Sequence, residues 1–108
     1  MKIINIHKSI TADELLQLIR QKLNPLFKEQ RQTEINFKTD NKDGIIEISQ
    51  PEIYEGYLFR IEIKGPELWI TRSEHYVDDV NSLTLESILN TLFEDLSGDK
   101  GVKIVLEG

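Results

Sequence analysis

The strongest constraint on the fold is a central stretch in which apolar and polar residues alternate. Within residues 33–73, four segments follow this two-residue period, and the turn signals Asp43-Gly44 and Gly65-Pro66 divide them into two pairs. Successive side chains of a strand point to opposite faces of a sheet, so this alternation predicts strands with one buried face. Because two-residue turns join neighbouring antiparallel strands, the sequence predicts two consecutive β-hairpins.

The first hairpin is expected to run from residue 33, turn at residues 40–44 and return until Pro51 stops it. Ile35 and Phe37 alternate on its first strand, and Ile46 and Ile48 alternate on its second. The second hairpin contains the most regular strand, residues 57–64, followed by residues 67–73. On its first strand the apolar face is predicted to carry Tyr57, Phe59, Ile61 and Ile63.

A helix is predicted before this meander, beginning at a capping box. The Thr11 hydroxyl can accept a hydrogen bond from the amide of Glu14, whose carboxylate reaches back to the cap. Asn24-Pro25 is expected to end or kink the helix, because proline disfavours the helical conformation in the residue before it. The apolar stripe of this helix consists of Leu15, Leu18, Ile19 and Leu23.

A second helix is predicted after the meander, with Thr84 as its N-cap and Gly98 as the left-handed residue that closes it. Its apolar residues lie on one side of a 3.6-residue period, so the helix is expected to bury one face, with Phe93 fully buried. These residues are Leu85, Ile88, Leu89, Leu92, Phe93 and Leu96.

Short strands are predicted at both ends, around Ile4 and Ile6 and across 102–107, where Val102, Ile104 and Leu106 share one side. The element order is therefore β-α-β-β-β-β-α-β. Each helix has one apolar stripe to bury, and a single face of the sheet accommodates both. The predicted fold is one α+β domain spanning residues 1–108, with a mainly antiparallel sheet of five or six strands and two helices on one face.

Composition narrows the class of protein. The chain is 39% hydrophobic and 30% charged, which is enough apolar material for one core and is unlike a disordered chain. It contains no cysteine, so disulfides and cysteine metal sites are excluded. Its first residues lack the apolar region of a signal peptide, and no apolar run approaches the roughly 20 residues that span a bilayer. We therefore expect a cytoplasmic protein that does not enter the membrane.

Charge is distributed unevenly along the chain. Residues 1–42 contain eight basic and five acidic side chains, a balance of +3, whereas residues 43–108 contain five basic and fourteen acidic, a balance of −9. Residues 74–99 include seven acidic residues and no lysine or arginine. Such a field argues against nucleic-acid binding and favours a basic partner. The alternative interpretation is an ordinary solvated face that keeps the domain soluble.

Aromatic residues interleaved with carboxylates suggest where a partner binds. Trp69 is predicted to point away from Leu68 and Ile70, toward the second face of the sheet, where an exposed ring could anchor a partner. The alternative is that Trp69 only covers this face beneath a loop. The predicted partner-binding residues are Glu52, Glu55, Trp69, Glu74, Tyr76, Asp78 and Asp79.

No residue pattern indicates catalysis. His7 and His75 are the two histidines, and His75 with nearby aspartates matches no named metal-binding spacing. Neither a phosphate-binding glycine loop nor a G-x-S-x-G nucleophile motif is present. The sequence therefore predicts a non-enzyme without metal or cofactor. Replacing either histidine by alanine is expected to leave the biological activity intact.

Three features together resemble bacterial immunity proteins, including those paired with contact-dependent growth inhibition toxins. They are the acidic tract 74–99, the two-hairpin core, and the final helix running through Gly98 into the last strand. This resemblance of type implies an inhibitor that binds and neutralises a basic toxin domain, often a nuclease, through carboxylates. The alternatives are a small acidic secretion chaperone or adaptor, or a structural or regulatory subunit. Partner identity and oligomeric state stay open.

Overall fold

The computed structural model describes residues 2–74, 76, 77 and 79–97, together with the backbone of residues 103–107. Its elements follow the predicted order, and the α+β class is confirmed. They are β1 (Lys2–Asn5), α1 (Ala12–Arg31), β2 (Lys38–Lys42), β3 (Ile45–Ser49), β4 (Tyr57–Lys64), β5 (Glu67–Arg72), α2 (Val80–Ser97) and β6 (Lys103–Glu107).

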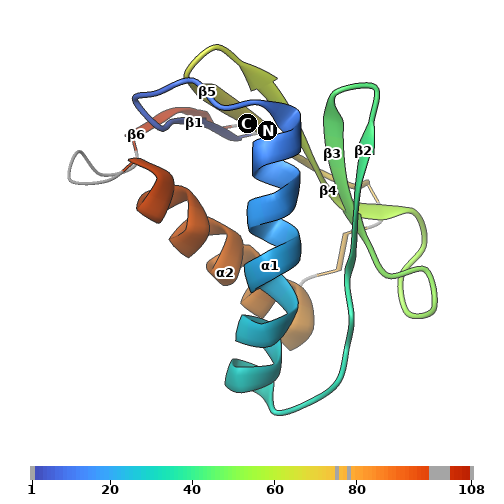
Figure 1. Cartoon of the computed structure of the whole chain (residues 1–108). Coiled ribbons are helices and arrows are strands. Elements are labelled where there is room, and N and C mark those ends of the chain that lie inside the picture. Colours follow the sequence, from blue (N-terminus) through green and yellow to red (C-terminus); the bar gives the residue numbers. More distant parts are fainter. Residues whose placement is uncertain (1, 75, 78, 98–102, 108) are drawn as a thin grey trace.

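The strands form one six-stranded sheet in the order β2-β3-β4-β5-β1-β6. Every neighbouring pair is antiparallel. The meander β2–β5 comes from the two hairpins, and β1 extends it by pairing with β5 on one side and β6 on the other (Figure 1). Segments from both ends of the sequence therefore complete the same sheet.

The first hairpin is shorter at its start and longer at its tip than predicted. β2 begins at Lys38 rather than at residue 33, and its pairing with β3 continues to Lys42 opposite Ile45. Only Asp43 and Gly44 form the turn, with φ angles of 54° and 88°. Positive φ at both central residues is the requirement of a type I′ turn, which joins strands directly. The prediction of a turn across residues 40–44 was therefore too wide.

Both helices lie in front of one face of the sheet, and the core fills the space between them (Figure 1). Phe27 of α1 and Phe93 of α2 have 0% exposed surface, which confirms the predicted burial of Phe93. The sheet contributes its apolar face to the same cluster. These strand residues include Ile4, Ile46, Ile48, Phe59, Ile61, Leu68 and Ile70.

The capping box at the start of α1 is present: the Thr11 hydroxyl accepts a hydrogen bond from the Glu14 amide at 3.1 Å. Of the two outcomes expected at Asn24-Pro25, an end or a kink, the first is wrong, because the helix continues through Pro25 to Arg31. An internal proline costs about 3 kcal/mol. Burial of Phe27 beyond it, with its ring edge-on to that of Phe37 at 4.9 Å, offsets much of that cost.

The cap of α2 also differs from the prediction. Asp79, not Thr84, caps the helix: its Oδ1 accepts a hydrogen bond of 2.7 Å from the Ser82 amide, and its carbonyl accepts the first helical bond, from Leu83. The Thr84 hydroxyl instead donates to the carbonyl of Val80 inside the helix. The predicted closing residue Gly98 and strand residue Val102 lie outside the described residues.

Candidate interaction surface

Trp69 lies on the outer face of the sheet, opposite to the helices. It pairs with Glu62 of β4 and Ile3 of β1, while the adjacent Leu68 and Ile70 are buried on the helix side. The orientation is therefore as predicted. The ring is not bare, because the Lys64 ammonium lies 3.8 Å from its centroid and its indole N–H donates to Glu67 at 3.1 Å.

Neighbouring residues on this outer face also pair cations with carboxylates and rings. The Glu47 carboxylate accepts hydrogen bonds from Arg60 at 2.7 Å and contacts the Lys42 ammonium at 3.1 Å, and the Arg60 guanidinium lies 4.4 Å from the Tyr57 ring. Burial alone raises the pKa of Glu47, but the bonds from Arg60 and Lys42 outweigh it and hold the pKa below its ordinary value. Charges of both signs are thus present on this face, and its two aromatic rings already have cation partners. The prediction that Tyr57 shares the apolar face with Phe59 was wrong, because a register shift between Ile48 and Ser49 places Tyr57 opposite Ser49 and buries Leu58 instead.

A different end of the molecule is organised by a hydrogen bond between two loops. The Tyr54 hydroxyl donates to Asp79 Oδ2 at 2.7 Å, which joins the loop 50–56 to the start of α2. Burial alone raises the pKa of the Asp79 carboxyl, but hydrogen bonds from Ser82 and Tyr54 outweigh it, so the pKa lies below its ordinary value. Asp79, predicted as a partner-binding residue, is half-buried and holds this junction together.

The other predicted carboxylates of this end are exposed. Glu52 and Glu55 lie on the loop 50–56, and Glu74 lies on the connection between β5 and α2. The Tyr54–Asp79 bond therefore brings the loops that carry them to one end of the sheet. Asp78, the remaining predicted carboxylate, lies outside the described residues, as does His75.

Tyr76, predicted as an anchor, is half-buried. It packs against the core with its ring edge-on to Phe59, 5.5 Å between centroids, and the Arg72 guanidinium lies 5.0 Å from the ring. His7, the other histidine, lies outside the strands. It is exposed beyond the end of β1 in a left-handed conformation with φ 63°, and its backbone N–H donates to Asn5.

No sequence prediction assigned a binding role to the large hydrophobic residues that are exposed at this same end. Ile53 is adjacent to Tyr54, Val77 and Val80 flank the Asp79 cap, and Leu83 follows one turn later. Their exposed fractions are 51%, 55%, 52% and 50%. The three-residue spacing of Val77, Val80 and Leu83 is a signal in the sequence, but it was obscured because Leu83 was placed before the helix.

The acidic tract identified in the sequence does not form one surface. Glu86 pairs with Arg72 at 3.2 Å, whereas Glu94 and Asp95 are exposed near the other end of α2. A helix rises about 1.5 Å per residue, so Asp95 lies about 22 Å along the axis from Val80. Only Glu74 and Asp79, among the described acidic residues of this tract, belong to the end that carries the exposed hydrophobic residues.

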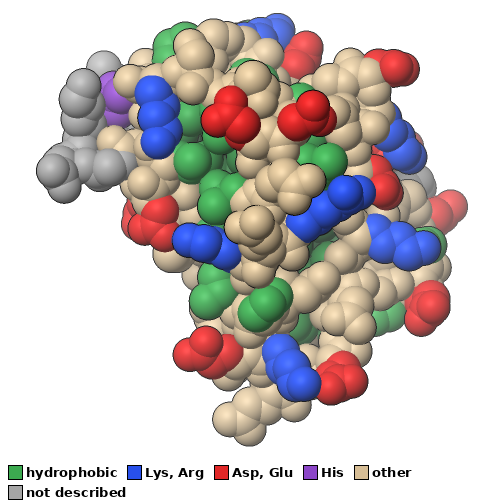
Figure 2. All heavy atoms as spheres, in the orientation of Figure 1, with side chains coloured by type: hydrophobic (Ala, Val, Ile, Leu, Met, Phe, Trp, Pro, Cys, Tyr) green, Lys and Arg blue, Asp and Glu red, His purple; other side chains and the backbone are tan. Residues whose placement is uncertain are grey.

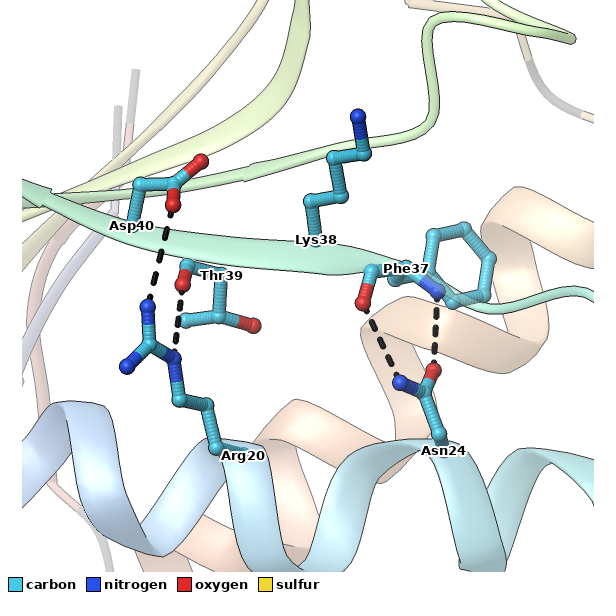
Figure 3. A pocket seen from close by; sticks show the side chains of 6 residues that line it. All are labelled: Arg20, Asn24, Phe37, Lys38, Thr39 and Asp40. Atoms are coloured by element: carbon cyan, nitrogen blue, oxygen red, sulfur yellow. Dashed lines mark hydrogen bonds and ion pairs between the residues drawn. The ribbon is translucent and has the colours of Figure 1, made fainter.

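A hollow of about 240 Å³ lies between α1 and the edge strand β2 (Figure 3). The side-chain amide of Asn24 bonds both the N–H and the carbonyl of Phe37, at 2.8 and 3.1 Å, and Arg20 Nε donates to the Thr39 carbonyl at 3.0 Å. These bonds satisfy backbone groups on the outer edge of the sheet, which would otherwise be open to pairing with another strand. The polar lining of the hollow is thus largely committed to closing the edge.

Searches for similarity gave no match among protein-family models, curated proteins or solved structures. Within the described residues, no group of three or more histidine, aspartate or glutamate side chains is placed to hold a metal ion. No helix in the same part of the chain is both long and apolar enough to cross a membrane.

Proposed function

We propose that this chain is an immunity-type inhibitor that binds and neutralises a basic toxin domain, with a nuclease the favoured class. The observation that carries the proposal is the joined pair of loops with exposed Glu52, Glu55 and Glu74. Neither residues 50–56 nor residues 73–97 contain a lysine or arginine. Arg72, at the end of β5, pairs with Glu86 at 3.2 Å, and Lys38 lies opposite Ser49 just before the loop 50–56.

The electrostatics of such an end suit a basic partner. A net charge of −6 and a local excess of carboxylates speed the encounter with a positive surface, and this gain falls as salt rises. Nucleases present basic surfaces to their polyanionic substrates. A carboxylate-rich protein surface that occupies such a site competes with the phosphates, which is a direct route to inhibition.

A second candidate function is a small acidic secretion chaperone or adaptor subunit. One observation favours it: Val80 and Leu83 give the outer side of α2 an exposed apolar segment, as a dimerising or client-binding helix would have. The two functions differ in their readout. An inhibitor abolishes the activity of its partner, whereas a chaperone raises the yield of a partner that stays active.

The test uses the product of the gene adjacent to that of this chain, purified as a separate domain. We expect it to cleave plasmid DNA or transfer RNA, and we expect one equivalent of this chain to stop the cleavage. The triple variant Glu52→Gln/Glu55→Gln/Glu74→Gln should restore cleavage at low ratios, whereas Glu94→Gln/Asp95→Asn should inhibit like the wild type. Undiminished cleavage at a several-fold excess of wild-type chain would contradict the proposal.

A further inference from the structure

We infer that Ile53, Val77, Val80 and Leu83 form the contact core of an interface that docks a basic protein segment. This group of side chains is called the apolar end below. The inference rests on the proposed function and adds where, and with what chemistry, the partner binds. The expected partner carries its own apolar ridge flanked by lysine or arginine, and it packs the ridge on the apolar end while its cations face Glu52, Glu55 and Glu74.

The apolar end continues into an uncharged stripe on the outer side of α2. Val80, Leu83, Ser87 and Thr91 recur at intervals of three and four residues, and all four are exposed. Residues at this spacing share one side of a helix. The Thr91 hydroxyl donates to the Ser87 carbonyl at 3.1 Å, so it is bonded within the helix. The stripe extends about 16 Å from Val80 to Thr91.

The Tyr54–Asp79 bond gives this surface a second element and fixes its shape. Because Ile53 precedes Tyr54 while Val77 and Val80 flank Asp79, the bond holds the loop 50–56 beside the start of α2. Among the described residues, the large hydrophobic side chains that are at least half exposed are these four alone, and all belong to the two joined segments. Contiguous exposed apolar residues with a polar rim mark interaction sites on soluble proteins.

Charge determines which partner suits the surface. The exposed carboxylates Glu52, Glu55 and Glu74 belong to the segments that carry or adjoin the apolar end, so a partner with cations beside its apolar contact complements them. A second copy of this chain fits poorly, because a two-fold pair would place the same acidic rim opposite itself. The outer face of the sheet is a weaker candidate surface, since Lys64 and Arg60 already cover Trp69 and Tyr57.

The probe is a synthetic amphipathic helix with leucine on one face and lysine on the other, titrated into isotope-labelled protein and followed by amide chemical shifts. We expect shifts concentrated at residues 53 and 77–87, weaker in high salt. Val80→Ser/Leu83→Ser should weaken the affinity at least about tenfold, as for hot-spot residues. Gln17→Ser on the exposed side of α1 is the matched control and should bind unchanged. Denaturant titration checks that both variants stay folded.

Two further peptides distinguish the contribution of the apolar contact from that of the partner's positive charge. A leucine–glutamate helix and a lysine–serine peptide should both bind much more weakly than the leucine–lysine helix. Equal binding of the leucine–glutamate helix would overturn the inferred basic partner, and equal binding of the lysine–serine peptide would overturn the apolar contact. Absence of binding, shifts centred on Glu94 and Asp95, or self-association of the free chain that Leu83→Ser abolishes would each overturn the inference.

The inference and the proposed function fail in different ways. If the glutamine variants of the rim lose toxin neutralisation but Val80→Ser/Leu83→Ser retains it, the inhibitor function stands and the apolar contact falls. If the chain docks the leucine–lysine helix at the apolar end but does not inhibit its neighbour's product, the surface stands and the inhibitor function falls.

Discussion

The two helices bury similar apolar stripes against the same face of the sheet but present different outer surfaces. α1 has charged residues along its solvent side, where both signs of charge are interspersed (Figure 2). Its Arg20 and Asn24 side chains are used within the fold to close the edge of β2. α2 presents the uncharged stripe that begins at Val80 and Leu83. Polar side chains of α1 are thus used in contacts within the fold, whereas apolar side chains on the outer side of α2 stay exposed to solvent.

The two helices also differ in how their first turns are capped. α1 begins with a local capping box, in which Thr11 and Glu14 are three residues apart. α2 begins at Asp79, whose carboxylate also bonds Tyr54 from a loop 25 residues earlier in the chain. The start of α1 therefore depends on its own sequence, while the start of α2 is coupled to the loop that carries Glu52, Ile53 and Glu55.

The largest effect is expected where the two helices are alike. Phe27→Ala and Phe93→Ala should each reduce the free energy of unfolding by about 3–5 kcal/mol, because each removes a fully buried ring from the shared core. Urea titration measures the change. A loss below about 1 kcal/mol for Phe93→Ala would mean that α2 does not pack through this stripe.

The caps should differ by a smaller amount. Asp79→Ala should reduce stability by about 1–2 kcal/mol, because it removes the N-cap and leaves the hydroxyl of the buried Tyr54 without its acceptor. Thr11→Ala should cost about 1 kcal/mol. Combining Asp79→Ala with Tyr54→Phe tests the coupling. Additive losses would show that α2 starts independently of the loop 50–56.

Low pH should reduce the stabilisation that the Asp79 cap of α2 provides. The folded pKa of Asp79 lies below its ordinary value of 3.8, so the unfolded state binds the proton more readily. Its stabilisation is complete above the unfolded pKa and is lost as the pH falls through the folded pKa. Below about pH 5, wild type should therefore lose more stability than Asp79→Asn, which keeps a neutral cap. Parallel stability curves for the two proteins would contradict the assigned role of this carboxylate.

The smallest stability effect should come from the outer side of α2. Val80→Ser and Leu83→Ser should each change the free energy of unfolding by no more than about 0.5 kcal/mol, because both side chains are half exposed. Thermal and urea unfolding measure this change. Losses as large as those of Phe93→Ala would place these residues in the core and remove the reason to expect a partner there.

Local patterns predicted the elements whose stability is local. Three of these local predictions are confirmed. They are the turn at Asp43-Gly44, the capping box that begins at Thr11, and the buried stripe of α2 that includes Phe93. One prediction failed where a distant residue intervenes, because Asp79, which also bonds Tyr54, caps α2 in place of Thr84. Of the two outcomes expected at Asn24-Pro25, an end of α1 is excluded, since the helix continues to Arg31 and Phe27 beyond the proline packs against Phe37.

The candidate surface was predicted only in part, for the same reason. Glu52, Glu55 and Glu74 are exposed near one end, but Trp69 lies on a separate face. The count of charges along the sequence treated the acidic residues at both ends of α2 as one tract. In the structure the helix separates Val80 from Asp95 by about 22 Å along its axis. Exposure of Val80 and Leu83 depends on the true start of the helix, and that start is set by the tertiary contact between Tyr54 and Asp79.

The most direct measurement is the binding kinetics of the adjacent gene's product with three forms of this chain. They are the wild type, Val80→Ser/Leu83→Ser on α2, and Gln17→Ser on α1. The expected result is at least about a tenfold loss of affinity for the α2 variant alone, with wild-type association slowed by salt more than dissociation is accelerated. Equal affinity of all three forms, with association independent of salt, would contradict the claim that the outer side of α2 and its acidic rim bind a basic partner.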